Sequence, residues 1–478
     1  MTASHTLNLS AIPEFEELQA LLVSRASEVG QNSPIAHSSF EENVVDLTMA
    51  IAARIIADDA ERHDVNAPGL IHDGVSYRQK HRAERTYMSS AGPIRILRWV
   101  YVERGGHGGK TFVPLEAKLG IVGQFWTQRA AEVGCNYMEE TTSRRSCELL
   151  KLHKGMTPSA SSLDRLPKLI GAMWEENRVE LEEAVRAAEE LPPEDEIKAI
   201  LTSDDGVMMR KKDGELTDDG KVTVAFKEAG CGTLALLNAD GERKKTVKMA
   251  RMPEPGKKTL VEIMAGEMKR AKEAYPSVTW VAISDGAKSN WKIFEDLSRD
   301  VGVPLFVLLD FWHAMEHLAE ALNQVQKLSL EDRAAELARW KKDLQEKCHG
   351  PKQLIRRLEE LRAMVRCKGR LKNLDREIKY FRSNHEAGRM RWAKARAAGL
   401  PIGSGIQEAG CKTLVVERMK RSGMSWLTPG GQSILTLRAL QQSGRLALAF
   451  NALAPYFSTE FQIDPNPQRK RPNYAAAA

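Results

Sequence analysis

Three acidic residues stand where they could act together on a phosphodiester. Asp205 lies in the stretch TSDDG, Asp285 in ISDGAK and Glu408 in PIGSGIQEAGCK. Carboxylates are the hard oxygen ligands that Mg²⁺ and Mn²⁺ prefer, and Mg²⁺ keeps several waters, so three carboxylates suffice. Two such ions, about 3.5–4 Å apart, can grip the attacking and leaving oxygens of a phosphodiester. We therefore predict that these three residues are catalytic and hold two Mg²⁺ (or Mn²⁺) ions.

Each of these acids also has an ordinary structural explanation. An Asp-Gly pair after a strand is a common way to build a turn, and Glu408 at a helix start would complement the helix dipole. Asp204 competes with Asp205 for the same role, because both follow the same predicted strand. We favour Asp205, since Gly206 after it permits close approach of a ligand. Their joint placement, more than any one of them, supports a shared site.

A mixed sheet is the element predicted to position these acids. Short apolar or alternating stretches predict strands at 197–203, 221–226, 245–252, 278–284 and 303–309. Helices are predicted at 257–274 and 289–297, so three strands come first and then helix, strand, helix, strand. The first three strands suit a meander, and the last two extend the sheet in parallel. This order suits an α/β, ribonuclease-H-like mixed sheet with Asp285 at the carboxyl end of a strand.

Three further regions complete the predicted organisation. Residues 311–397 are charged and helical throughout, which predicts a helical insertion between the two parts of a catalytic domain, 197–310 and 398–450. The tail 464–478 has no core-forming residues, which predicts disorder. These boundaries leave residues 1–190 as a separate N-terminal region.

The N-terminal region, 1–190, is predicted to be mainly helical and to bind DNA. A sequence pattern typical of a helix-turn-helix occurs near 138–166, where a turn containing Gly155 leads to a helix capped by Ser159. Plain helical packing explains the same pattern equally well. A short β-hairpin is predicted before it, from 85–90 and 94–103.

Composition sets only broad limits on function. The net charge of +6, from 70 basic and 64 acidic residues, is too small to indicate nucleic-acid binding by itself. The six cysteines show no CxxC spacing, so no zinc ribbon is predicted. The sequence begins without a signal-peptide pattern and contains no run of 18 apolar residues, so we predict a cytoplasmic protein with no membrane span.

Longer motifs resemble a known family. SDDG at 203–206, SDGAKSNW at 284–291, DFWHAMEHL at 310–318 and the long blocks at 399–426 and 430–440 are similar to bacterial insertion-sequence transposases of the Kra type. Those enzymes are distantly similar to Mutator-like transposases. The resemblance covers about half of the chain, and the 399–440 block is its most specific part.

The resemblance implies a DDE transposase that cleaves insertion-sequence ends and joins the 3′-OH to target DNA. It implies that Asp205, Asp285 and Glu408 are the triad, with a helical insertion before the glutamate. It further implies transposon-end and target DNA as partners, and a homo-oligomer of at least two chains to hold two ends. One departure stands out: relatives carry a CxxC zinc hairpin where the stretch 99–120 has no cysteine.

Asp310 and His313 form a D-x-x-H word similar to the one that accompanies the triad in Mutator-like relatives. There it would order the site or the nearby DNA rather than hold metal, although a histidine satisfied by a local hydrogen bond explains it equally well. The same segment, HAMEH, matches the H-x-x-E-H word of zinc peptidases, with His313 and His317 on one helical face. A zinc peptidase is therefore a lesser alternative, for which no third ligand is evident.

Basic and aromatic residues beyond Glu408 are candidates for DNA contact. Cations there could meet phosphates, and a tryptophan could stack on an unpaired base. The ordinary alternatives are a salt bridge between Glu408 and Lys412, one helical turn apart, and a buried tryptophan. The candidate DNA-binding residues are Lys412, Arg418, Lys420, Arg421 and Trp426.

Two further functions remain open at this point. A DNA-binding regulator, or an inactive transposase derivative, would use only the helix-turn-helix and the basic helix. A structure-selective nuclease of the same fold would cut DNA without joining it. All three acids are present in the sequence, which argues against an inactive site.

Overall fold

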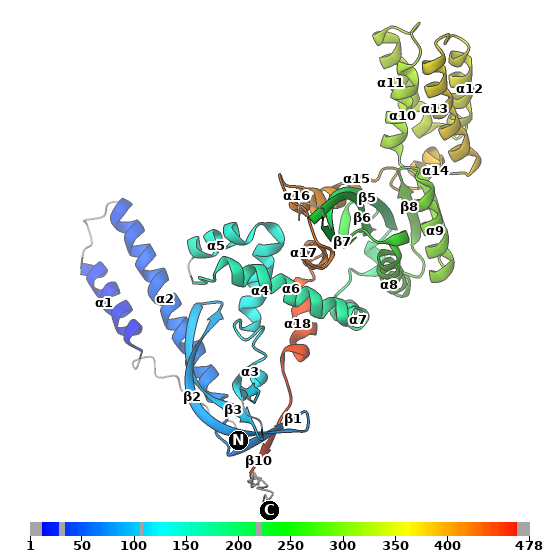
Figure 1. The fold of residues 1–478 in the computed structure, drawn as a ribbon. Coiled ribbons are helices and arrows are strands. Elements are labelled where there is room, and N and C mark those ends of the chain that lie inside the picture. Colours follow the sequence, from blue (N-terminus) through cyan, green and yellow to red (C-terminus); the bar gives the residue numbers. More distant parts are fainter. Residues whose placement is uncertain (1–11, 28–33, 106–108, 154, 217–221, 466–478) are drawn as a thin grey trace, which may run out of the picture. The chain divides into compact units, whose positions relative to one another are not determined.

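The computed structural model divides the chain into two compact units, Met1–Leu181 with Leu446–Ala478, and Glu182–Arg445. It describes residues 12–27, 34–105, 109–153, 155–216 and 222–465, so most of the predicted disordered tail lies outside the described residues. Each unit contains one five-stranded sheet with helices around it, which makes the protein a mixed α/β fold (Figure 1). Within the described ranges, no helix has the length and apolar character needed to cross a membrane.

The first unit is built on an antiparallel sheet of order β10-β1-β2-β3-β4. The predicted hairpin is confirmed as β2 and β3, which pair from Tyr77↔Glu103 to Ser89↔Gly92. The elements of this unit are α1 (Pro13–Ser27), α2 (Pro34–Arg62), β1 (Gly69–His72), β2 (Val75–Ser89), β3 (Gly92–Glu103), β4 (Thr111–Phe112), α3 (Pro114–Leu119), α4 (Gln128–Glu140), α5 (Ser143–Leu152), α6 (Ala160–Glu176), α18 (Leu446–Phe457) and β10 (Gln462–Asp464).

Helices make up most of the described residues of the N-terminal region, but its sheet is larger than the short hairpin that was predicted. The middle of β2 reads HRAER, and its side chains are exposed or half-exposed. Because these residues lack the alternation of apolar and polar side chains that indicates a strand, this part of β2 was not predicted. Strand β10 pairs with β1 from the far end of the chain. Helix α18 belongs to this unit as well, whereas residues up to 450 were predicted to lie in the catalytic domain.

Helices α4, α5 and α6 pack on one another where the helix-turn-helix was predicted. Ser159 caps α6 by accepting a hydrogen bond from the amide of Ser162 at 3.1 Å, as expected. Two details differ: the predicted helix 138–152 breaks between α4 and α5, and α6 continues through Pro167 to Glu176. A role of helices α4, α5 and α6 in recognising DNA stays a prediction.

The second unit contains every strand and helix predicted between 197 and 309. The elements are α7 (Arg178–Ala188, which begins in the first unit), β5 (Ala199–Leu216), β6 (Val222–Leu237), β7 (Arg243–Arg251), α8 (Lys258–Ala274), β8 (Thr279–Ser284), α9 (Lys288–Val301), β9 (Leu305–Leu309), α10 (Phe311–Asn323), α11 (Leu330–Glu346), α12 (Gly350–Arg362), α13 (Lys368–Glu386), α14 (Trp392–Ala397), α15 (Gly405–Cys411), a π-helical turn (Lys412–Val416), α16 (Glu417–Met419) and α17 (Thr428–Gln442).

The sheet of this unit has the order β7-β6-β5-β8-β9. Strands β5, β6 and β7 form an antiparallel meander, while β8 and β9 join β5 in parallel. Strands β5 and β6 are much longer than predicted: β5 continues past 203 into a stretch with exposed Arg210, and β6 continues past 226 into the buried stretch 229–237. Asp205 therefore lies within β5, two residues beyond Ser203, where the pairing with β8 ends.

Apolar side chains cover both faces of this sheet. One cluster joins the sheet to α8 and α9 and continues into α10–α14 through buried Trp340, Leu358 and Phe381. A second cluster packs Met209 and Cys231 of the sheet against Leu414 and neighbouring residues of the segment that follows α15. The helical segment 311–397 thus shares a hydrophobic core with the sheet.

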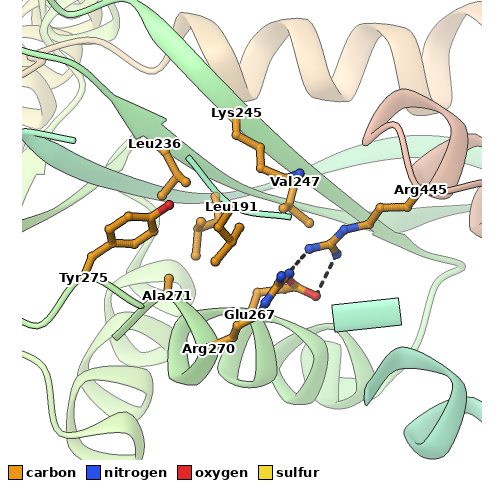
Figure 2. Close-up of a pocket in the computed structure, with 10 residues that line it drawn as sticks. Leu191, Leu236, Lys245, Val247, Glu267, Arg270, Ala271, Tyr275 and Arg445 are labelled. Atoms are coloured by element: carbon orange, nitrogen blue, oxygen red, sulfur yellow. Dashed lines mark hydrogen bonds and ion pairs between the residues drawn. The ribbon is translucent and has the colours of Figure 1, made fainter. Parts of the chain in front are cut away.

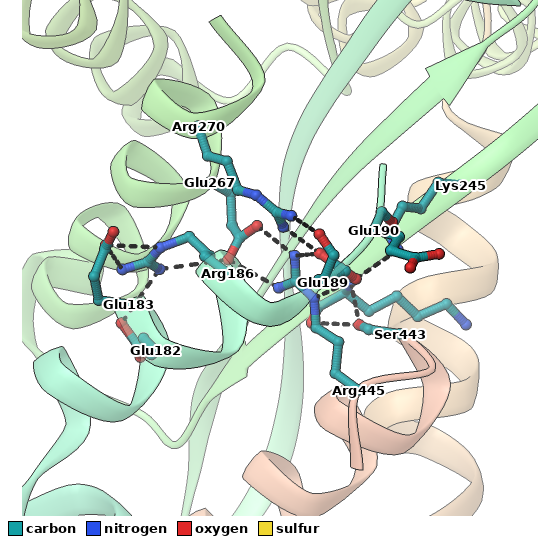
Figure 3. A network of polar contacts seen from close by, with 11 residues as sticks. Glu182, Glu183, Arg186, Glu189, Glu190, Lys245, Glu267, Arg270, Ser443 and Arg445 are labelled. Atoms are coloured by element: carbon teal, nitrogen blue, oxygen red, sulfur yellow. Dashed lines mark hydrogen bonds and ion pairs between the residues drawn. The ribbon is translucent and has the colours of Figure 1, made fainter. Parts of the chain in front are cut away.

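A buried ionic network crosses the second unit near the sheet (Figure 3). Arg445 bonds Glu189 through Nε at 2.9 Å and Nη2 at 2.6 Å, and bonds Glu267 of α8 through Nη1 at 2.9 Å and Nη2 at 2.8 Å. Arg270 also bonds Glu189, and Lys245 of β7 lies 2.5 Å from it. The network therefore joins the chain after α7, strand β7, helix α8 and Arg445, three residues after the end of α17.

A small cavity beside this network is lined by Leu236, Val247, Ala271 and Tyr275 together with the charged groups (Figure 2). Its volume is about 10 Å³, which is room for about one water molecule. We therefore regard the network as structural rather than as a ligand site.

The network predicts a loss of stability in acid. Burial alone would raise the pKa of Glu189, but hydrogen bonds and charges from Arg445, Lys245 and Arg270 lower it to about 2. A depressed folded-state pKa stabilises the fold above the ordinary value of 4.5, and this stabilisation is lost as the pH falls toward 2. In urea unfolding, Glu189→Gln should therefore be less stable than wild type at pH 7, by at most about 3 kcal/mol.

The difference between Glu189→Gln and wild type should shrink steadily between pH 4.5 and pH 2. Glu183→Gln is the control, because that carboxylate is 74% exposed. A difference for Glu189→Gln that stays constant down to pH 2 would contradict the assignment.

Candidate active site

Asp205 and Asp285 lie near each other at one edge of the parallel part of the second unit's sheet. The pairing of β5 with β8 ends at Ser203 and Ile283, so Asp205 and Asp285 each come two residues beyond the last pair. The side-chain amide of Asn290 bonds both the backbone of Asp204 and the Asp285 carboxylate. Burial raises the pKa of Asp205, and the charge of Asp285 raises it further.

Asp204 points to the opposite face, because successive strand residues alternate. Its carboxylate is fully buried and lies 3.0 Å from Nζ of Lys257, at the start of α8. Burial raises the pKa of Asp204 to about 6, although Lys257 opposes this shift. A carboxylate enclosed with its own lysine is poorly placed to hold an ion, which favours Asp205 over Asp204 for the site.

A tight turn fixes the Asp285 carboxylate. Its Oδ1 accepts hydrogen bonds from the Ser284 hydroxyl at 3.0 Å and the Ala287 amide at 2.9 Å. The amide group of Asn290, which is buried in the first turn of α9, donates to the same oxygen at 3.4 Å and to the backbone carbonyl of Asp204 at 3.3 Å. Asn290 thus links the two strands that carry the aspartates.

Glu408 lies on α15, which packs over the sheet face that carries Asp205. Two residues anchor this helix: Gln407 donates to the carbonyl of Cys231 at 2.8 Å, and the Cys411 thiol lies 3.8 Å from Oδ2 of Asp205. Glu408 is adjacent to Gln407 and one turn before Cys411, so its backbone is held beside Asp205. A π-helical turn follows directly, a feature that is frequent at functional sites.

The Glu408 side chain itself is exposed, and it makes no hydrogen bond or ion pair within the described part of the chain. The salt bridge to Lys412 that was considered from the sequence is accordingly not formed. Across the described ranges, no group of three or more His, Cys, Asp or Glu side chains converges to hold a metal ion. The structure thus brings Asp205 and Asp285 together and sets Glu408 on the adjoining helix with its carboxylate free to turn.

The donor set suits a hard divalent cation. Two half-buried carboxylates lie close enough that the like charge of Asp285 disfavours ionisation of Asp205. A divalent cation would relieve that repulsion, and carboxylates are ligands that Mg²⁺ and Mn²⁺ accept. Asp205 and Asp285 would hold it, and Glu408 is within the same part of the fold.

Asp310 orders the segment that leads to Glu408. It is buried at the start of α10, where its Oδ1 accepts the His313 amide at 2.7 Å and its Oδ2 accepts the Ser404 amide. One carboxylate therefore caps α10 and fixes the loop before α15. This supports the interpretation that the D-x-x-H word orders the site.

His313 does not reach this carboxylate with its ring. Its Nδ1 lies 3.2 Å from Glu316, and its Nε2 lies 3.3 Å from Nε2 of His317. A zinc peptidase would need a third protein ligand here. The described residues supply none, so the HAMEH segment does not form a peptidase zinc site in this structure.

The predicted DNA-contacting residues divide into two groups. Lys412, Lys420 and Arg421 are exposed. Arg418 is only 3% exposed and lies over the ring of Trp426, whose indole N–H donates to the Met419 carbonyl at 3.0 Å. Arg418 and Trp426 therefore have packing roles, which leaves the other three cations as the candidates for phosphate contact.

Several residues of the site were missed from the sequence. Asn290 sits in the SDGAKSNW word, five residues after Asp285, and could have been found as a polar residue in the first turn of a helix after a strand. Tyr380 of α13 gave no such signal, yet its hydroxyl donates to the backbone carbonyl of Asp285 at 2.9 Å. Burial, reinforced by the charge of Asp285, holds the pKa of Tyr380 well above its usual range, so it remains a donor.

No family model and no curated protein matches this chain. Among solved structures, it is similar to the Drosophila P element transposase strand transfer complex, at 16% identity. That match covers 71% of this chain and 83% of the other, with a TM-score of 0.26. A likeness at this TM-score establishes neither a shared fold nor a shared function.

Proposed function

We propose that the second unit is a ribonuclease-H-like catalytic domain and that the protein is a DNA transposase of the DDE type. The observation that carries the proposal is the proximity of Asp205 and Asp285, just beyond the point where the parallel pairing of β5 and β8 ends. Glu408 on the helix over the sheet face that carries Asp205 supplies the third acid. The sheet order, a three-stranded meander extended by two parallel strands, supports the fold assignment.

The proposed reaction has two phosphoryl-transfer steps. In the first, a water oxygen bonds to phosphorus at the element end, the P–O3′ bond breaks, and a free 3′-OH and a 5′-phosphate result. In the second, that 3′-oxygen bonds to a target phosphorus and the target's own 3′-oxygen leaves as a hydroxyl. The proposed reaction has no covalent protein–DNA intermediate. Both displacements therefore occur in line on phosphorus.

The chain's own residues would bind and orient the reactants. Asp205 and Asp285 would hold the ions, and Glu408 would close the set by turning its exposed side chain inward. Bound Mg²⁺ or Mn²⁺ would supply charge neutralisation at the attacking and leaving oxygens. Asn290 and Tyr380 keep the Asp285 turn in place through a side-chain and a backbone contact.

DNA partners follow from the proposed reaction. The exposed cations Lys412, Lys420 and Arg421 lie on the segment after Glu408, and we propose that they contact phosphates. Helices α5 and α6 of the first unit are the candidates for reading the element ends. Because two ends must be joined to one target, we propose an assembly of at least two chains.

The direct test uses purified full-length protein and labelled duplexes that span the flanks of its own gene. Incubation with Mg²⁺ and a circular target DNA should yield nicked ends and then labelled target, and EDTA should abolish both products. Cleaved ends without labelled target would instead indicate a structure-selective nuclease. Tight binding with no cleavage in either Mg²⁺ or Mn²⁺ would indicate a DNA-binding regulator.

Tyr380→Phe should lower the strand-cleavage rate at saturating DNA by up to about tenfold, with little change in DNA affinity. It removes one hydrogen bond to the Asp285 carbonyl, and such a bond contributes roughly 0.5–1.5 kcal/mol. Tyr275→Phe is the matched control, because that hydroxyl bonds the Pro192 carbonyl at 2.7 Å on another part of the unit. Equal rates for wild type and Tyr380→Phe would remove Tyr380 from the site.

A further inference from the structure

Two imidazoles in the HAMEH segment form a cluster that the proposed reaction does not use. His313 and His317 lie one turn apart on α10, and their Nε2 atoms are 3.3 Å from each other. Each Nδ1 faces a carboxylate: Glu316 for His313 at 3.2 Å, and Glu377 of α13 for His317 at 2.5 Å. Both rings are partly open to solvent, with side-chain exposures of 38% and 28%.

These contacts leave the two Nε2 atoms facing each other. A carboxylate accepts, so each Nδ1 is placed to carry the hydrogen and donate it. In the tautomer with a hydrogen on Nδ1 alone, each ring presents a lone pair at Nε2, and the two Nε2 atoms are 3.3 Å apart. A cation between the two nitrogens would use both lone pairs.

The separation fits a tetrahedral ion. With metal–nitrogen bonds of about 2.0–2.1 Å, two nitrogens 3.3 Å apart subtend roughly 104–111° at the ion, close to the tetrahedral angle. Metal-binding histidines almost always donate their other N–H to a carboxylate or carbonyl, which fixes the ring. Here Glu316 and Glu377 already hold that position.

The ring of His317 is also held from its face. Tyr380 stacks on it with ring centroids 3.9 Å apart and an interplanar angle of 23°. Glu377 is 1% exposed and receives a second hydrogen bond from Arg376 at 2.8 Å, so it cannot easily turn away. One of the two nitrogens is therefore preorganised, and the more exposed His313 can adjust to it.

We propose that His313 and His317 form a two-nitrogen binding site for a divalent transition ion of borderline softness, such as Zn²⁺ or Co²⁺. Imidazole nitrogen suits such ions, whereas Mg²⁺ prefers oxygen, so this site differs in chemistry from the carboxylates at Asp205 and Asp285. Water or an added ligand fills the remaining positions. The ion links α10 to α13 through Glu377, next to the Tyr380 contact with Asp285.

The site is tested by Co²⁺ titration of the full-length protein. Metal is first stripped with a chelator, accessible thiols such as Cys348 and Cys367 are alkylated, and several millimolar Mg²⁺ is kept present to occupy the carboxylates. The readouts are visible absorption of four-coordinate Co²⁺ and the bound stoichiometry. Wild type should bind one Co²⁺ per chain, and Zn²⁺ should displace it.

Variants assign the ligands. His313→Ala removes a partly exposed ring and should weaken Co²⁺ binding at least tenfold, while Glu377→Gln should weaken it by about 10–100-fold. His349→Ala is the control, because that histidine is exposed on the same helical segment and far from the pair in sequence. Circular dichroism checks that each variant is folded.

Two outcomes would overturn the site: wild type that binds no Co²⁺, or His313→Ala that binds it as tightly as wild type. Neither outcome depends on DNA cleavage, so the result stands apart from the proposed transposase activity.

Discussion

Asp285→Asn should abolish Mg²⁺-dependent strand cleavage and joining, with a loss on the order of 10³-fold or more. The substitution keeps the size of the side chain, and the amide oxygen can still accept from Ala287 and Ser284, so the turn should survive. What disappears is the negative charge beside Asp205. Glu408→Gln should have a similar effect, because its exposed carboxylate has no structural partner in the described part of the chain.

Matched controls separate lost chemistry from lost folding. Asp296→Asn replaces a surface acid of α9, and Glu417→Gln replaces an exposed acid of α16 within ten residues of Glu408. Both should cleave labelled ends at the wild-type rate. DNA binding of Asp285→Asn, measured in the presence of Ca²⁺, should also remain. If Asp285→Asn and Glu408→Gln cut as well as wild type, the assigned catalytic residues are wrong.

Arg445→Met should destabilise the second unit by about 3 kcal/mol, the lower end of the usual cost of breaking a buried ion pair. The arginine side chain is 6% exposed and makes four hydrogen bonds to Glu189 and Glu267. Its removal leaves two buried carboxylates with fewer partners. The cost should not be larger, because Arg270 still bonds Glu189 and Arg186 lies 3.5 Å from Glu267.

Urea unfolding followed by hydrogen exchange would measure this loss and locate it in residues 182–445. The control is Arg299→Met, which removes an arginine that is 70% exposed and bonded only to surface acids, and which should not shift the unfolding midpoint measurably. Equal stability of Arg445→Met and wild type would show that apolar packing, rather than the network, holds the end of α7 to the sheet.

The sequence predicted the second unit better than the first. The apolar run VTWVAIS predicted the bounds of β8 to within one residue, because a strand that is buried on both faces is apolar throughout. The outer part of β5 and most of β2 were missed, since their exposed side chains are charged and break the alternation. The inner part of β6 was missed although it is buried, because Gly230 and Gly232 interrupt its apolar run. Strand β10 could not be predicted, because its partner β1 lies almost 400 residues earlier.

The site shows the same division. Strand ends and Asp-Gly words pointed to Asp205 and Asp285, and a resemblance pointed to Glu408. The choice between Asp204 and Asp205 needed the fold, because only the direction of each side chain across the sheet separates a carboxylate enclosed with Lys257 from one beside Asp285. Arg418 and Trp426 looked like DNA contacts until their packing against each other was visible.

By itself, the sequence determined which local elements form and which acids are available, because hydrophobic periodicity and turn chemistry act over a few residues. The tertiary structure alone decided what those elements bring together: Tyr380 on the backbone of Asp285, Asp310 on the loop before Glu408, and Glu377 on His317. Such contacts join residues 60 to 95 positions apart. They depend on how the helices pack on the sheet, and sequence patterns over a few residues do not determine that packing.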